Sequence, residues 1–209
     1  MSIGPIGTPA PGERAVGTFT FSGDAGLEKY QWPYIVIAGR TPGPKVLVTA
    51  GIHAAEYTGT EAAIRLGRTL DPKDVRGTLL ILPLLNRPGF FERSIYVNPE
   101  DNDNLNRLFP GDPKGTWGQR FAHRMLTDII TGFDHSIDLH AGDLIEALTP
   151  FVIYRETGDS VLDARIKRMV DAYGAPYAVK SAPTGERPGQ LYAVAALRSE
   201  ERRVGKECW

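Results

Sequence analysis

The segment from Val46 to Gly59, VLVTAGIHAAEYTG, places the strongest constraint on the fold of this chain. It opens with an apolar, β-branched run, turns at Ala50–Gly51 and becomes helical near Thr58. Strand, tight turn and helix in succession are typical of a buried parallel sheet, in which polar groups gather at the carboxyl ends of the strands. The turn carries His53 and Glu56, so an imidazole and a carboxylate can point to one spot and share a zinc ion.

A third candidate ligand lies far downstream. Residues 136–140, SIDLH, indicate a second short strand that ends on His140. Three protein ligands leave the fourth position of a tetrahedral zinc ion open for water, which is the arrangement of a catalytic site. His53, Glu56 and His140 are therefore candidate ligands of a zinc ion, and the alternative is that they are ordinary core or loop residues. Asp138 points to the same side of its strand as His140 and could orient the histidine or the water.

The pattern of the remaining chain predicts an α/β fold with a mixed, largely parallel central sheet flanked by helices. Further strands are expected over residues 17–21, 31–38, 77–85, 151–154 and 177–180, and helices over 58–70, 116–130 and 161–173. The first helix would turn Ala62, Ala63, Leu66 and Leu70 to the core, and the second Phe121, Met125, Leu126 and Ile129. Residues 1–30 are predicted to be a loose arm with a possible strand, because their start is rich in Gly and Pro, and residues 31–197 a catalytic domain.

Residues 86–111 contain few apolar residues and many turn formers. A long loop inside a compact domain usually serves function. Its adjacent Asn106 and Arg107 can hold a carboxylate with an amide and a guanidinium fork. Arg93 in the same loop could polarise a carbonyl and stabilise an oxyanion.

Composition excludes several classes of function. A net charge of −1 gives no argument for nucleic acid or an anionic membrane as partner. No apolar run approaches the ~20 residues of a transmembrane helix. The first residues show no secretory signal, and the single cysteine, Cys208, excludes an internal disulfide. We therefore predict a cytoplasmic protein.

The last residues look foreign to the rest of the chain. Residues 198–208, RSEERRVGKEC, look like the in-frame translation of a common sequencing adapter. Residues 198–209 are therefore predicted to be a non-native tail. On this interpretation the genuine sequence stops at Leu197, inside an unfinished helix, and the chain is the front part of a longer protein.

Three motifs in this order, GIHAAEYTG, DNDNLNRLFPG and DLHAGD, resemble the succinylglutamate desuccinylase/aspartoacylase family of the zinc-carboxypeptidase-like superfamily. The resemblance extends from about Tyr34 to Leu197. It implies a single catalytic zinc ion on His53, Glu56 and His140, a substrate carboxylate bound by Asn106 and Arg107, and a carbonyl polarised by Arg93.

The chain departs from the family at two places. Ala54 stands where the family usually has glycine, which is tolerable unless the position needs a positive φ. The family's general base is a glutamate on a strand that follows a helix similar to GQLYAVAAL, and this strand is missing here. Glu146 and Glu186 do not match its position. We therefore expect a hydrolase as parent protein and an impaired fragment.

The implied activity is hydrolysis of the amide bond of a small, carboxylate-bearing N-acyl amino acid, and an ester could react at the same site. A zinc carboxypeptidase acting on peptides would use the same ligands. A non-catalytic zinc-binding protein would keep the zinc ligands but lack the general-base glutamate. A nucleotide-binding Rossmann protein is disfavoured, because GIHAAEYTG has too few glycines to cradle a pyrophosphate.

Overall fold

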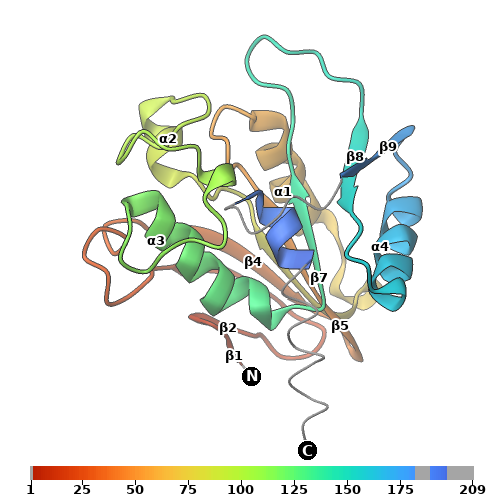
Figure 1. Ribbon diagram of the computed structural model, residues 1–209. Coiled ribbons are helices and arrows are strands. Elements are labelled where there is room, and N and C mark those ends of the chain that lie inside the picture. Colours follow the sequence, from red (N-terminus) through yellow and green to blue (C-terminus); the bar gives the residue numbers. More distant parts are fainter. Residues whose placement is uncertain (1, 182–188, 197–209) are drawn as a thin grey trace, which may run out of the picture.

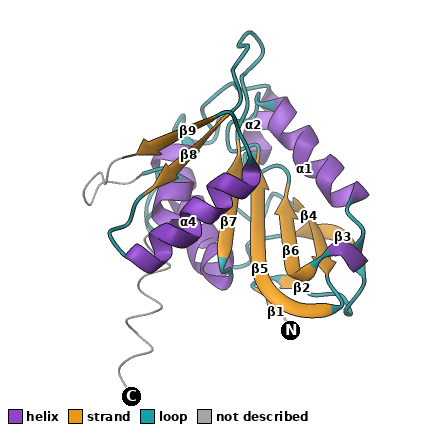
Figure 2. Cartoon of the chain, turned by 90° about the vertical axis from the view of Figure 1, so that its right-hand side faces the viewer, coloured by secondary structure: helices purple, strands orange, loops and turns teal. Residues whose placement is uncertain are grey.

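The structure is a computed structural model that describes residues 2–181 and 189–196 (Figure 1). Its centre is a five-stranded sheet with the order β3-β4-β6-β5-β7, which Figure 2 shows side by side. These strands are β3 (Arg14–Phe19), β4 (Trp32–Ala38), β5 (Thr41–Ala50), β6 (Arg76–Leu82) and β7 (His135–Leu139). β5 is parallel to β6 and β7, and β4 is antiparallel to β3 and β6. β4 alone therefore runs against the others, and the predicted mixed, largely parallel sheet is confirmed.

Each side of the sheet carries its own apolar core. Neighbouring residues of a strand face opposite sides, so Val36 belongs to the larger core and Ile37 to the smaller one. The larger core includes α3 (Trp117–Arg124), and the smaller one includes Ala63 of α1 (Tyr57–Thr69). Burial on both sides explains the apolar runs in the second half of β5 and of β6.

Helix α1 forms where it was expected, but only part of its predicted inward face meets the sheet. Ala63 is buried and Leu70 packs against the smaller core, whereas Ala62 and Leu66 are exposed. The buried residues are instead small, namely Gly59, Thr60, Ala63 and Gly67. A Cβ atom on Gly67 would lie 2.3 Å from Cδ1 of Ile35, so the helix lies too close to the sheet for larger side chains. The prediction was therefore correct for Ala63 and Leu70 and wrong for Ala62 and Leu66.

Helix α3 agrees with the prediction in its buried face. Thr116 caps its start, and the side chain of Gln119 completes a capping box. The helix continues as a π turn over Met125–Ile129 and a 3₁₀ turn over Ile130–Gly132. The four residues predicted to face inward are all buried, namely Phe121, Met125, Leu126 and Ile129.

The N-terminal segment packs onto the domain, in contrast to the predicted loose arm. Strands β1 (Ser2–Ile3) and β2 (Ile6–Gly7) form an antiparallel pair. Ile6, Phe21 and Leu27 are buried in the larger core. Apolar residues scattered among Gly and Pro can fill a core without any periodicity, so the sequence pattern does not predict their burial.

The segments that connect the strands of the central sheet contain short helical elements. A 3₁₀ turn at Pro72–Asp74 precedes β6. The predicted long loop is only partly irregular, because it contains α2 (Arg87–Glu92) and a 3₁₀ turn over Leu105–Arg107.

Strands β8 (Phe151–Arg155) and β9 (Tyr177–Ser181) form a separate parallel pair, connected by α4 (Ser160–Tyr173). Figure 1 shows these three elements together.

The C-terminal part that the structure describes includes helical residues 191–196, of which Leu191 is fully buried. The predicted non-native tail lies outside the described residues. Within the described part, no helix is long and apolar enough to cross a membrane.

Candidate metal centre

The turn after β5 positions the first two candidate ligands. Gly51 has a φ of +65°, which glycine adopts without steric cost. A Cβ atom on Gly51 would also lie 2.9 Å from atoms of Leu84 and Thr60, so the turn packs tightly on its surroundings. The chain then reaches His53 and Glu56, both of which are mostly buried.

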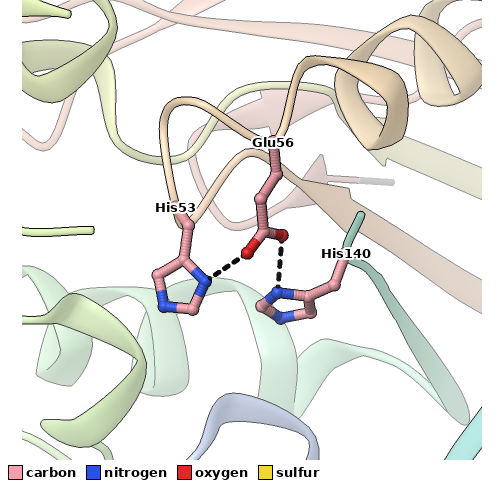
Figure 3. A group of neighbouring side chains, drawn as sticks. All are labelled: His53, Glu56 and His140. Atoms are coloured by element: carbon pink, nitrogen blue, oxygen red, sulfur yellow. Dashed lines mark hydrogen bonds and ion pairs between the residues drawn. The ribbon is translucent and has the colours of Figure 1, made fainter. Parts of the chain in front are cut away.

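His140, the third candidate ligand, follows β7 and lies at the same edge of the sheet. Nδ1 of His53 lies 2.7 Å from Oε1 of Glu56, and Nδ1 of His140 lies 2.9 Å from Oε2 (Figure 3). The backbone N–H of Ala141 also donates to Oε2, at 3.0 Å. The two imidazoles therefore meet at the two oxygens of one carboxylate.

The opposite nitrogen of each imidazole has its own partner. Nε2 of His53 lies 3.1 Å from Oδ1 of Asn104. Nε2 of His140 lies 3.0 Å from Oδ2 of Asp138, whose other oxygen accepts a 2.7 Å hydrogen bond from the hydroxyl of Thr49. In both rings the outer partners therefore hold Nε2 and leave Nδ1 facing Glu56.

The electrostatics of the group favour a carboxylate flanked by cationic imidazole. Burial would raise the pKa of Glu56, but hydrogen bonds from His140, His53 and Ala141 outweigh it and lower the pKa to about 2. Burial would lower the pKa of His140, but hydrogen bonds to Asp138 and Glu56 raise it to about 10. A positive charge is thus stabilised among these side chains.

The same group fits a metal ion. Donor atoms of His53, Glu56 and His140 lie within 4.8 Å of one another. Two imidazole nitrogens and one carboxylate from two strand ends form a donor set of the kind that zinc accepts, with a position left open. Outer hydrogen bonds that ligand imidazoles donate, here to Asn104 and Asp138, are a regular feature of such sites.

The structure brings Asn106 close to this group, whereas no described contact joins Arg107 to the three candidate ligands. Nδ2 of Asn106 lies 3.3 Å from Nε2 of His140, and Asn106 is buried. The exposed Arg107 donates to the backbone oxygen of Asn106, at 2.8 Å. Arg93 is exposed and caps the end of α2 with a φ of +54°, and among the described contacts none joins it to the three candidate ligands.

Two residues near the group were not identified from the sequence. Asn104 contacts His53, as described above. Tyr96 packs its ring edge-on against His53, with ring centroids 5.6 Å apart, and its hydroxyl donates to Asp143 at 2.6 Å. Both lie in the long loop that sequence analysis associated with function, but nothing local distinguishes them from other polar loop residues.

The concern about Ala54 is resolved by its backbone. The described non-glycine residues with positive φ are Arg93 and Asn102. Ala54 therefore has an ordinary φ, and its methyl group is buried without strain of this kind.

Comparison with known proteins adds independent information. Residues 42–204 match the model of the succinylglutamate desuccinylase/aspartoacylase catalytic domain. The chain is 33% identical over 145 residues to the N-alpha-acetyl-L-2,4-diaminobutyric acid deacetylase of Halomonas elongata, an alignment that covers 69% of this chain and 42% of that protein.

Solved structures agree with this match. A succinylglutamate desuccinylase/aspartoacylase from Rhodobacter sphaeroides is 31% identical with a TM-score of 0.73, over 89% of this chain and 55% of the other. A metallo-carboxypeptidase from Burkholderia cenocepacia shares the fold, with 16% identity and a TM-score of 0.57, over 92% of this chain and 52% of that one. The chain thus spans about half the length of these relatives.

Proposed function

The chain belongs to the succinylglutamate desuccinylase/aspartoacylase family, and from this premise we propose that it carries the zinc site of a hydrolase for small N-acyl amino acids. The bond cleaved would be the amide between the acyl group and the amino acid. One observation carries this proposal: Nδ1 atoms of His53 and His140, from two strand ends, converge on the two oxygens of Glu56.

His53, Glu56 and His140 would hold the zinc ion, with Asn104 and Asp138 orienting the two imidazoles. When bound, zinc supplies Lewis-acid chemistry, which makes water more acidic and a carbonyl more electrophilic. The residues themselves contribute a donor set in which His53 and Glu56 are buried and His140 is exposed. Short contacts hold the donor atoms of His53, Glu56 and His140 close to one another.

The substrate would be a carboxylate-bearing amide held next to this site. Arg107 presents an exposed guanidinium next to Asn106, and Asn106 presents an amide beside His140. Together they would bind the carboxylate and keep the scissile carbonyl in register. Arg93 would stabilise the developing oxyanion, which requires its exposed side chain to turn toward the site when substrate binds.

Proton transfer to the leaving amine requires a further carboxylate. Glu56 and Asp138 are both engaged by the two histidines. We propose that the general base is a glutamate in the part of the relatives' length that this chain does not span. Reading the parent gene beyond codon 197 tests this proposal together with the predicted tail.

The experiment combines metal content with hydrolysis. This chain, and the protein extended by its natural sequence, would be loaded with zinc. Both would be assayed with N-acetyl amino acids, N-succinyl amino acids and dipeptides. We expect one zinc ion per chain in both proteins. We expect release of free amino acid from the N-acyl substrates by the extended protein, and little by this chain.

Each other outcome selects a different interpretation. Faster cleavage of dipeptides would favour the carboxypeptidase. Zinc binding without hydrolysis by the extended protein would favour a non-catalytic zinc protein. Full activity of this chain would overturn the proposal that the general base lies outside it. Absence of zinc binding would overturn the proposed function.

A further inference from the structure

Asn104 connects a metal-ligand histidine with the turn that carries Asn106 and Arg107. Its Oδ1 atom lies 3.1 Å from Nε2 of His53 and 3.0 Å from the backbone nitrogen of Asn106. We propose that Asn104 is a positioning residue whose single amide oxygen sets both the proton on His53 and the place of the substrate-binding turn. This inference rests on the proposed function and deepens it.

The second hydrogen bond identifies which atom of the amide faces His53. Oxygen and nitrogen of an asparagine side chain are hard to distinguish by shape. The backbone N–H of Asn106 can only donate, so the atom it meets on Asn104 is the oxygen. An acceptor facing Nε2 of His53 requires a proton on that nitrogen. Nδ1, beside Glu56, is then the nitrogen left to bind a metal.

The two ligand histidines have outer partners of different charge. His140 donates to the carboxylate of Asp138, which raises the basicity of the ring. His53 faces a neutral amide, which gives direction without adding charge. Asn104 therefore contributes geometry to the site, and Asp138 contributes both geometry and charge.

The turn that Asn104 caps directs the amide of Asn106 into the site. Oδ1 of Asn106 accepts a 2.9 Å hydrogen bond from the backbone N–H of Leu191, so its NH₂ group is the part that faces His140. Nε2 of His140 already donates to Asp138, and two donors cannot bond to each other. The NH₂ group therefore stays available to a substrate, at a position that depends on Asn104.

Two substitutions distinguish the effect of losing the hydrogen-bond acceptor of Asn104 from the effect of changing its packing. Asn104→Leu keeps the branched shape of the side chain but removes the acceptor, whereas Asn104→Asp keeps an acceptor oxygen. Asn98→Leu is the matched control: Asn98 lies in the same loop, is fully buried and donates to Asp101 at 2.8 Å. Zn²⁺ affinity would be measured by competition with a chromophoric chelator, and the ligand geometry by the absorption spectrum of bound Co²⁺.

We expect Asn104→Leu to weaken Zn²⁺ binding about 10- to 100-fold, as removal of outer partners of ligand histidines does elsewhere. Asn104→Asp should restore the affinity to within about 3-fold, because the acceptor is back. Asn98→Leu should bind Zn²⁺ like the original chain. The ¹⁵N resonances of the His53 ring in the Zn²⁺-loaded chain should show a proton on Nε2, and this measurement needs no variant.

Several outcomes would overturn the inference. Equal Zn²⁺ affinity of Asn104→Leu and the original chain would refute it while leaving the proposed function intact. Equal weakening by Asn104→Leu and Asn98→Leu would mean that only general stability matters. A proton on Nδ1 of His53 would refute the tautomer assignment, and no Zn²⁺ binding by the original chain would refute both proposals.

Discussion

Thr49 and Asp138 are register partners on the parallel strands β5 and β7, and the hydroxyl of Thr49 donates to Oδ1 of Asp138 at 2.7 Å. The other carboxylate oxygen of Asp138 lies 3.0 Å from Nε2 of His140. A pair within the sheet thus fixes a carboxylate that in turn orients a candidate metal ligand. The Asp138 side chain is only 2% exposed, so this orientation is protected from water.

Replacement of this carboxylate should weaken metal binding. Asp138→Asn keeps the size of the side chain but removes its charge, so the ring of His140 becomes less basic. We expect Zn²⁺ affinity to fall about 10- to 100-fold, measured by chelator competition. Asp74→Asn, at an exposed position of a 3₁₀ turn, is the control and should leave the affinity unchanged. Equal affinities of the two variants would contradict a role for Asp138.

Zinc should stabilise the folded chain, and its removal should reverse the effect. Ligand at 100 times its Kd raises the free energy of unfolding by about 2.7 kcal/mol. We expect a higher Tm with Zn²⁺ and a return to the original value with a chelator. His140→Ala should lose the shift, whereas His123→Ala, on α3, should keep it. A shift of the same size in both variants would point to binding elsewhere.

Gly111 should tolerate no side chain. Its φ is +84°, and a Cβ atom would lie 2.2 Å from the backbone nitrogen of His123 and 2.4 Å from the backbone oxygen of Gln119. Gly111→Ala therefore forces the segment that follows Arg107 away from α3. We expect a loss of about 2–4 kcal/mol in urea unfolding.

The control for this change is Gly132→Ala. A Cβ atom on Gly132 meets no heavy atom within 4 Å, and its φ is not positive. We expect a change within about 0.5 kcal/mol. Similar losses in the two variants would mean that close approach to α3 is not what constrains Gly111.

Asp24 should make stability depend on pH. Its carboxylate accepts hydrogen bonds from the backbone of Gly26 and Leu27 and from Nε of Arg120, the last at 2.7 Å. Burial would raise the pKa of Asp24, but the hydrogen bonds of Arg120 and Leu27 outweigh it and hold the pKa below its ordinary value of 3.8. The stabilisation is therefore complete above this value and is lost as the pH falls through the lower, folded-state pKa.

Asp24→Asn should lower the free energy of unfolding by about 1–3 kcal/mol at pH 7, because hydrogen bonds to a charged group are lost. The difference from the original chain should shrink at a pH below the folded-state pKa of Asp24, where this carboxyl is itself protonated. Urea unfolding at the two pH values measures this. Asp171→Asn, in an exposed pair with Lys167, should have little effect. A difference that is the same at both pH values would exclude the titration of Asp24 as its cause.

The sequence alone was sufficient to predict β5, β6, α1 and α3 and the residues that meet at the sheet edge. The apolar runs of β5 and β6 and the period of α3 are local patterns, and each reflects burial that the neighbouring residues share. His53, Glu56 and His140 were singled out because each follows a strand, and parallel strands end at one edge. The structure brings these three side chains together there.

Tertiary structure alone decided which face of α1 is buried, how Ile6 joins the core and which partner holds each ligand ring. Gly67 faces Ile35 because helix and sheet approach closely, a distance that no periodicity encodes. Asn104 reaches His53 across 51 residues of chain. Such contacts depend on how separate elements pack, whereas secondary structure depends largely on neighbouring residues, and this difference separates what could be predicted from what could not.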